Sequence, residues 1–331
     1  MNAELIHPEL RAAFTRLPRL PFHNRLFVAI FRMITRLAPT PAPGPGIAIE
    51  NRTMTRAGVR IYRPGRSLSK AGLLWMHGGG LISGHPAMDD GICAALARDL
   101  DLVVVSVRYR LAPRHPYPAA IDDCVEGWEW LRRSARDLGI DPTRVVVAGQ
   151  SAGAGLAACL AQRILDAGSG PPAAQVLFCP MLDDRTATRY ELDGIDHPLW
   201  NNRSNRAAWE WYLGRPAGLS AAPPYAVAAR REDLAGLPPT WITVGDIDLF
   251  FDEDRRYADR LQEAGVACRL HISPHAPHSF QSLVPDAELS RRLFLSLYEF
   301  LGQVLGLAPL PARCSYGRGA GAPDPAGAPL A

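Results

Sequence analysis

The sequence of 331 residues has no hydrophobic run long enough to cross a bilayer. Its most apolar stretch near the N-terminus, Leu26 to Ile34, is too short for a transmembrane helix and is interrupted by Arg32. The first residues also lack the pattern of a secretory signal peptide. We therefore expect no membrane span and a cytoplasmic location.

Lysine is nearly absent, since Lys70 is the one lysine among 36 basic residues. Arginine thus carries almost all of the positive charge, which is typical of a GC-rich coding bias. Against 33 acidic residues the net charge is only +3, and the basic residues are interspersed along the chain. Because no basic cluster is interleaved with aromatic residues, we expect no nucleic-acid partner.

The sequence also lacks cysteines at C-x-x-C spacing. Six cysteines lie far apart, and five of them fall within apolar helix or strand patterns; they are Cys93, Cys124, Cys159, Cys179, Cys268 and Cys314. A buried, reduced thiol is the expected state in such patterns, which agrees with a reducing compartment. No group of residues has metal-ligand spacing, so we expect neither a metal nor a cofactor.

Short apolar strands alternate with helices along most of the chain. A hydrophobic content of 47% and a charged content of 21% are those of an ordinary globular protein. The predicted strands are residues 47–50, 59–62, 73–76, 102–107, 144–148, 175–178, 241–244 and 268–272. The first two are predicted to form an antiparallel pair. The alternation predicts an α/β fold with a mostly parallel sheet flanked by helices.

The N-terminal residues predict an arm outside this sheet. Residues 1–37 read as two short helices separated at Pro18 to Pro21, and a stiff linker rich in proline and glycine runs to residue 46. In the second helix, apolar residues recur at helical spacing; they are Leu26, Ile30, Met33, Ile34 and Leu37. This stripe fits either packing on the main domain or contact with substrate.

The division of the chain follows from these shifts in composition. We predict an arm with its linker at residues 1–46 and a main domain at 47–307. Within the domain, residues 183–224 form a helical insertion, which should lie near the binding crevice because it joins two sheet strands. Residues 308–331 are rich in proline, glycine and alanine and are predicted to be a disordered tail.

The sequence Gly-Gln-Ser-Ala-Gly at residues 149–153 lies between a predicted strand and a predicted helix. A serine on so tight a turn exposes its hydroxyl, and the flanking glycines let the backbone cross closely. The helix N-terminus that follows places free N–H groups where an oxyanion would form. We predict Ser151 as a nucleophile and the N–H of Ala152 as an oxyanion donor.

A glycine-rich loop, His77 to Gly80, follows another core strand. Glycines leave backbone N–H groups unshielded, so we predict that Gly78 and Gly79 complete an oxyanion hole with Ala152. His77 is expected to hold this loop through a hydrogen bond of its ring rather than to act as a base.

A nucleophilic serine requires a general base. Downstream of the serine the chain has four histidines, and two of them, His275 and His278, lie in the loop after the last predicted strand, where the base should sit. Of these two we favour His278, although loop position alone does not separate them. His271 lies within a strand pattern and His197 within the insertion.

The acid that orients the base should follow the strand at 241–244. Asp246, Asp248 and Asp252 all lie there, and their spacing does not distinguish which of the three is the acid.

Four ordered motifs resemble the bacterial hormone-sensitive-lipase family of α/β-hydrolase esterases, over about residues 47–305. They are His77 to Gly80, Tyr109 to Pro113 with Pro116-Tyr117-Pro118, Gly149 to Gly153, and Pro277-His278. The resemblance implies an α/β-hydrolase fold and a helical cap, which residues 1–45 and 183–224 resemble. It also implies Asp248 as the acid, within a pattern matching residues 248–253, and His278 as the base.

Two residues depart from the pattern of this family. Gln150 stands where aspartate is most frequent, and Leu249 replaces the usual proline. Neither change alters a catalytic group, but Gln150 removes a carboxylate beside the serine.

The resemblance implies a serine carboxylesterase that hydrolyses short- to medium-chain acyl esters through Ser151, His278 and Asp248. The expected partner is a small-molecule acyl ester, and the sequence is compatible with a homodimer. An amidase or a deacetylase of an acylated natural product would use the same residues. A non-catalytic receptor on this fold is disfavoured, because the gibberellin receptors that resemble the family lack the histidine found here as His278.

Overall fold

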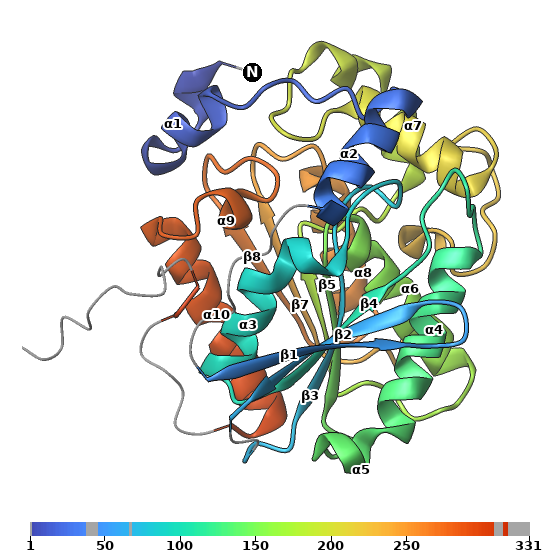
Figure 1. Cartoon of the computed structure of the whole chain (residues 1–331). Coiled ribbons are helices and arrows are strands. Elements are labelled where there is room, and N and C mark those ends of the chain that lie inside the picture. Colours follow the sequence, from blue (N-terminus) through green and yellow to red (C-terminus); the bar gives the residue numbers. More distant parts are fainter. Residues whose placement is uncertain (1, 38–45, 66–67, 308–313, 317–331) are drawn as a thin grey trace, which may run out of the picture.

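A computed structural model describes residues 2–37, 46–65, 68–307 and 314–316. A single eight-stranded sheet has the strand order β1-β2-β4-β3-β5-β6-β7-β8 (Figure 1). The strands are β1 (Ile47–Thr53), β2 (Gly58–Pro64), β3 (Gly72–Met76), β4 (Val103–Arg108), β5 (Val145–Gln150), β6 (Ala174–Phe178), β7 (Thr240–Gly245) and β8 (Cys268–Ser273). β2 pairs antiparallel with β1 and β4, and the remaining pairs are parallel. The predicted fold class is confirmed.

Helices cover both faces of the sheet (Figure 1). The helices of the described residues are α1 (Pro8–Thr15), α2 (Arg25–Leu37), α3 (Asp90–Asp99), α4 (Ala119–Arg133), α5 (Ala135–Leu138), α6 (Ala152–Asp166), α7 (Asn202–Leu213), α8 (Phe251–Glu263), α9 (Phe280–Leu283) and α10 (Glu288–Leu305). One hydrophobic core lies between the sheet and α4, α6 and α8, and the other lies between the sheet and α3 and α10. Because both faces are covered, a central strand such as β5 is buried along its whole length.

Helix α3 was not predicted from the sequence. Its residues from Ile92 to Ala97 are all buried, so the helix shows no alternation of apolar and polar residues that a periodicity argument could detect. Residues 119–138 form two helices rather than one, because the backbone at Ser134 (φ −87°, ψ 4°) interrupts the helix between α4 and α5.

The second helix of the N-terminal arm, α2, packs differently from the expectation. The predicted apolar stripe is exposed, and the helix instead turns Val28 and part of Phe31 toward the domain. Periodicity identifies the apolar side of a helix, but here a second set of apolar residues on the opposite side makes the packing contacts.

Part of the predicted tail lies against the domain. Cys314 is buried, with its sulfur 3.2 Å from the hydroxyl of Tyr298 on α10, and the N–H of Ser315 donates to Asp99. The ring of Tyr316 packs on Phe294. The expectation of disorder does not hold for residues 314–316, because an aromatic and a buried thiol supply packing surface. The remainder of the tail, like most of the linker, lies outside the described residues.

The cysteines at positions 93, 124, 159, 179 and 268 carry free thiols. Within the part of the chain that the structure describes, every helix is too short or too polar to cross a membrane.

Candidate active site

Ser151 occupies the turn between β5 and α6, at the carboxyl edge of the parallel strands. Its backbone lies at φ 55° and ψ −121°, a conformation that L-residues rarely adopt. The neighbouring glycines make the turn sterically feasible: a Cβ on Gly153 would lie 2.1 Å from the carbonyl oxygen of Met76, and one on Gly149 would lie 2.5 Å from the carbonyl group of Gly153. The strained turn holds the serine side chain at the strand end.

The structure brings Ser151, His278 and Asp248 into one chain of hydrogen bonds. His278 Nε2 lies 2.9 Å from Ser151 Oγ, and His278 Nδ1 lies 2.8 Å from Asp248 Oδ2. The aspartate follows β7 and the histidine follows β8, so three of the four adjacent strands β5 to β8 contribute one residue each. All three residues are buried. The arrangement can move a proton from the hydroxyl to the imidazole.

Neighbouring groups fix this orientation. The N–H of Phe250 donates to Asp248 Oδ1 at 3.0 Å, which leaves Oδ2 for the histidine. The ring of Phe250 also packs edge-on against the imidazole, with ring centroids 5.2 Å apart.

The other downstream histidines do not reach the serine. His271 lies within β8 and stacks on Trp241, while the exposed His275 has its backbone in the loop next to Asp246. His197 lies in the insertion, where Nδ1 is buried without a hydrogen-bond partner.

The two remaining acids have other partners. Asp246 Oδ1 accepts a hydrogen bond from the backbone N–H of His275 at 2.6 Å, so it holds the loop that carries the histidines. This is the turn-forming role that side chains of aspartate commonly play. Asp252 forms an ion pair with Arg189 at 2.8 Å.

The charge of Asp248 controls the pKa of the imidazole. Burial by itself lowers the pKa of His278, but the adjacent carboxylate and its hydrogen bond outweigh this effect and hold the pKa well above 6.5. An imidazolium cannot accept the serine proton, so activity is lost as the pH falls through this pKa.

We therefore expect kcat/KM to rise with pH through an apparent pKa above 6.5. Asp248→Asn removes the negative charge beside His278, so the rise of the residual kcat/KM with pH should occur at lower pH. Profiles of kcat/KM measured between about pH 5 and 9 for both proteins test this. A wild-type limb at or below 6.5, or a limb that Asp248→Asn leaves in place, would contradict it.

The glycine-rich loop after β3 lies directly beside the serine. A Cβ on Gly78 would lie 3.6 Å from the Cβ of Ser151, and Gly79 has φ 116° with no room for a side chain next to the carbonyl of Ser83. Ala152 begins α6, so its N–H belongs to the first helical turn, where amides have no partner within the helix. Gly78 and Gly79 line the same cavity as Ser151, and Ala152 directly follows the serine.

His77 holds the loop as predicted. Its Nδ1 lies 2.8 Å from the carbonyl oxygen of Gly78, and its ring stacks on Tyr109 with centroids 4.2 Å apart. Burial lowers the pKa of His77 to about 4, so the ring is neutral near pH 7.

Asp89 is a residue of the site that the sequence analysis missed. It lines the cavity, and its carboxylate accepts a hydrogen bond from Trp75 Nε1 at 2.7 Å. Burial raises the pKa of Asp89 to about 7, while hydrogen bonds from Trp75 and from the Gly78 amide oppose that rise. Asp89 belongs to no sequence motif, so the sequence alone does not identify it as a site residue.

Gln150, the departure noted beside the serine, joins two parts of the site. Its Oε1 accepts hydrogen bonds from Ser282 Oγ at 2.8 Å and from Gln281 Nε2 at 3.1 Å. Both donors lie in α9, just after the histidine loop. The glutamine therefore connects the end of β5 to this loop by neutral hydrogen bonds.

A cavity of about 210 Å³ opens onto the serine hydroxyl. The N-terminal arm, the insertion and the region after His278 all contribute apolar side chains to it; they are Leu20, Phe22, Phe31, Leu199, Trp200 and Leu283. Phe22 and Trp200 are in ring contact at 5.4 Å, so the arm and the insertion meet above the site. Their sequence separation is why the sequence alone could not place them together.

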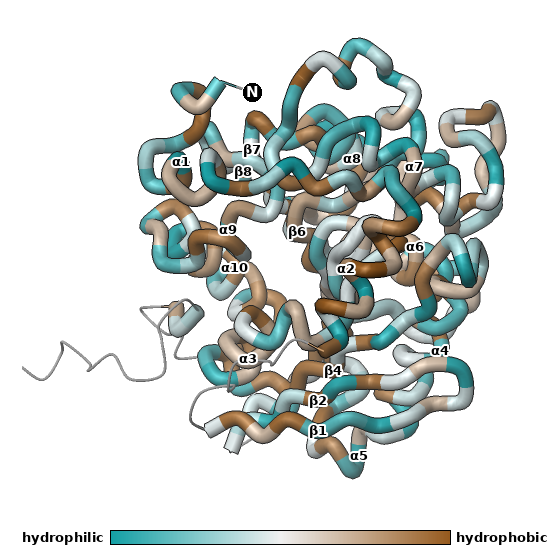
Figure 2. Tube along the Cα trace, turned by 45° about the horizontal axis from the view of Figure 1, so that its top comes forward, coloured by the Kyte–Doolittle hydropathy of each residue, from teal (hydrophilic) through white to brown (hydrophobic). Residues whose placement is uncertain are grey.

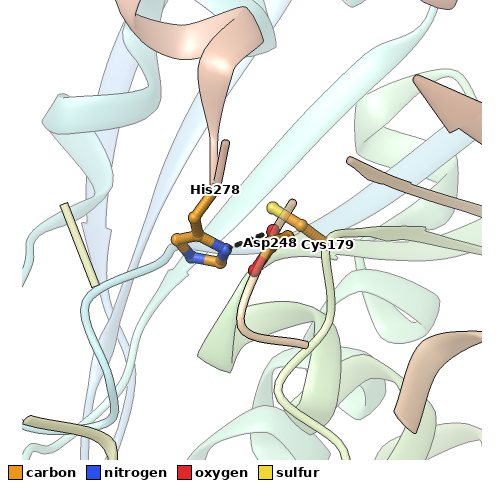
Figure 3. A group of neighbouring side chains, drawn as sticks. All are labelled: Cys179, Asp248 and His278. Carbon is orange, nitrogen blue, oxygen red and sulfur yellow. Dashed lines mark hydrogen bonds and ion pairs between the residues drawn. The ribbon is translucent and has the colours of Figure 1, made fainter. Parts of the chain in front are cut away.

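Cys179, Asp248 and His278 offer three ligand atoms within 4.8 Å of one another, and Figure 3 shows the thiol beside the hydrogen-bonded pair. Such atoms could bind a metal ion. However, His278 Nδ1 and Asp248 Oδ2 are already hydrogen-bonded to each other, and a metal would have to break that bond. The donor set fits the hydrogen-bonded pair better than a metal centre.

The sheet, the strained serine turn and the adjacent glycine loop define the class of α/β hydrolases. A profile of the family described as alpha/beta hydrolase fold matches residues 73–282. Esterase LipI of Mycobacterium tuberculosis is 34% identical over 274 residues, which cover 82% of this chain and 80% of that protein. Ethyl acetate hydrolase of Pseudomonas putida is 32% identical over 246 residues, covering 70% of this chain and 74% of that protein.

Among solved structures, a bacterial heroin esterase superimposes with a TM-score of 0.81 at 32% identity, covering 93% of this chain and 100% of that one. The chain belongs to the α/β-hydrolase fold family, in its bacterial hormone-sensitive-lipase-like branch.

Proposed function

We propose that the protein hydrolyses carboxylic esters of short to medium acyl chain, with Ser151 as nucleophile, His278 as general base and Asp248 as the acid that orients it. The observation that carries this proposal is the continuous hydrogen-bonded chain of 2.9 Å and 2.8 Å through the imidazole, at the base of a small apolar cavity.

In the first half of the reaction, Ser151 Oγ attacks the ester carbonyl carbon while its proton passes to His278 Nε2. Amides of Gly78, Gly79 and Ala152 stabilise the negative charge that develops on the carbonyl oxygen. Asp248 stabilises the imidazolium. The tetrahedral intermediate then collapses, His278 returns the proton to the departing alkoxide, and an alcohol leaves the acylated serine.

In the second half, a water molecule repeats the attack on the acyl-enzyme. His278 takes one proton from the water, the carboxylic acid departs, and Ser151 regains its proton. Each step uses only the side chains and amides named above.

The relatives support a small ester as substrate. The names ethyl acetate hydrolase and heroin esterase describe proteins that act on esters of modest size, and both align over most of this chain. The free, mainly buried thiols support a reducing, cytoplasmic setting.

The described part of the arm, residues 2–37, and the insertion at 183–224 form the cap of this proposed site. Phe22 and Phe31 from the arm, and Leu199 and Trp200 from the insertion, restrict the cavity above Ser151.

We expect kcat/KM for 4-nitrophenyl esters to fall once the acyl chain exceeds about eight carbons, because the cavity is small and closed by aromatic rings. Phe31→Ala should extend the accepted range, since it removes a ring that lines the cavity. Phe27→Ala is the matched control: Phe27 contacts Phe22 but does not line the cavity. Faster hydrolysis of the palmitoyl than of the butyryl ester by the wild type would contradict a closed pocket.

A further inference from the structure

Helix α2 carries its largest exposed apolar side chains on the outside of the molecule. We call these residues the outer stripe of α2; they are Leu26, Ile30, Met33, Ile34 and Leu37. Their exposed fractions range from 45% for Ile30 to 76% for Leu37. Because they recur at helical spacing, they form one continuous apolar surface. Figure 2 shows α2 on the side turned toward the viewer, with much of its trace hydrophobic.

The outer stripe is not needed to hold the helix in place. Val28 is buried on the opposite side, and Phe31 contacts Phe22 with ring centroids 5.1 Å apart. Arg32 reaches the domain as well, and its Nε donates to the carbonyl oxygen of Ile82 at 2.6 Å. With these contacts made on the inner side, the outer stripe is left free for another surface.

Positive charge borders the outer stripe. Between Glu9 and Glu50 the sequence has no acidic residue but six arginines, at positions 11, 16, 19, 25, 32 and 36. Arg19 pairs with Asp196, and Arg25 lies over the ring of Trp211. Arg36 is exposed and, among the described residues, has no acidic partner.

More positive charge lies near the end of α2. Burial is the main cause that lowers the pKa of His85. The positive charges of Arg108, Arg60 and Arg36 lie close enough to lower this pKa further, while Asp90 raises it. Asp90 is itself paired with Arg60. The exposed arginines at 36 and 108 therefore make this end of the helix attractive to anions.

The mouth of the cavity lies beside the same helix. Phe31 of α2 lines the cavity, together with Met88 and Leu283, both of which are also substantially exposed. The apolar surface of the outer stripe and the apolar rim of the cavity are thus close neighbours on the molecule.

We propose that the outer stripe of α2 docks the protein on an anionic lipid surface, with its apolar side chains inserted at headgroup depth and the neighbouring arginines paired with lipid phosphates. An amphipathic helix with a basic border and no acidic residue is the kind that lies in a membrane interface. Arginines near an anionic surface are attracted to it electrostatically, and the attraction grows with their number. Docking does not depend on the chemistry at Ser151.

Two other occupants fit the surface less well. A second copy packed about a two-fold axis would bring Arg25 and Arg36 of both copies together, and α2 itself has no acidic residue to pair with them. A globular protein partner would need about 800 Å² on this side, whereas the outer stripe is one convex helix of 13 residues.

The test is co-sedimentation of the full-length protein with vesicles of phosphatidylcholine alone and of phosphatidylcholine mixed with phosphatidylglycerol. We expect binding to the mixed vesicles that weakens as salt is added. Ile30→Glu with Ile34→Glu should lower the bound fraction about tenfold or more, because each change removes apolar surface and adds a repelled charge. Ile272→Glu, at an exposed isoleucine on β8, is the matched control and should bind like the wild type.

Turnover of 4-nitrophenyl acetate in the absence of vesicles should be unchanged in all variants, which shows that they are folded and separates docking from catalysis. Failure of the wild type to bind the mixed vesicles would overturn the proposal. Equal binding to both kinds of vesicle would overturn the role of the arginines. A wild-type dimer that the double variant dissociates, without vesicle binding, would assign the surface to a second copy instead.

Discussion

Replacing Ser151 with alanine is expected to lower kcat for 4-nitrophenyl butyrate by about 10⁴-fold or more. The hydroxyl oxygen is the atom that attacks the ester, and its one side-chain hydrogen bond is the 2.9 Å contact with His278 Nε2. Removing it eliminates the acyl-enzyme route and leaves only the stabilisation supplied by the loop amides. Because alanine can adopt the same backbone conformation as serine, the melting temperature should change little.

Ser282→Ala provides the matched control for this experiment. Ser282 lines the same cavity, but its hydroxyl donates to Gln150 and does not reach the imidazole. Its kcat should stay within about tenfold of the wild type, as expected for loss of one neutral hydrogen bond. Undiminished turnover in a folded Ser151→Ala protein would reject Ser151 as the nucleophile.

Asp248→Asn is expected to reduce kcat by up to about 10⁴-fold with the fold retained. The carboxylate accepts the Nδ1 proton at 2.8 Å, which leaves Nε2 free to take the serine proton. An amide in its place can donate to Nδ1 and so favours the wrong tautomer of the imidazole. It also removes the charge that stabilises the imidazolium.

Asp246→Asn is the matched comparison, because it makes the same chemical change two residues away. Asp246 accepts a hydrogen bond from the backbone N–H of His275, so the substitution should cost about 1 kcal/mol of stability and little turnover. Measurements of kcat and melting temperature on both variants decide the matter. A large catalytic loss in Asp246→Asn at unchanged stability, with Asp248→Asn close to wild type, would reverse the assignment.

The sheet was predictable because buried parallel strands appear in the sequence as short continuous runs of apolar residues. Residues 144–148 include a run of β-branched valines, and this run begins the β5 strand, Val145–Gln150. The serine turn was predictable for a different reason: a Cβ at Gly149 or Gly153 would lie only 2.5 Å or 2.1 Å from backbone atoms, so few other sequences fit.

The choice among acids and bases needed more than spacing. Asp246 and Asp248 both follow closely after β7, and the resemblance to a family selected the one that the structure places beside His278. Contacts among distant segments left no local signal. Phe22 and Trp200 meet although 178 positions separate them, since tertiary packing alone decides which surfaces touch.

The outer stripe of α2 illustrates a limit of periodicity. A stripe such as Leu26, Ile30 and Leu37 ordinarily marks the side of a helix that faces a core. Here both sides of the helix are apolar, and the inner side carries Val28 and Phe31. The spacing therefore predicted the helix correctly, but not the direction in which it faces.

Covalent capture of the nucleophile is the most direct test of the proposed mechanism. A 4-nitrophenyl phosphonate ester should transfer its phosphonyl group to an activated serine and release 4-nitrophenol, because the resulting adduct mimics the tetrahedral intermediate. Mass spectrometry of the digested protein should find one adduct per chain, on Ser151. The same reaction should be absent in Ser151→Ala and greatly slowed in Asp248→Asn. An adduct on another residue, with loss of activity, would contradict the account.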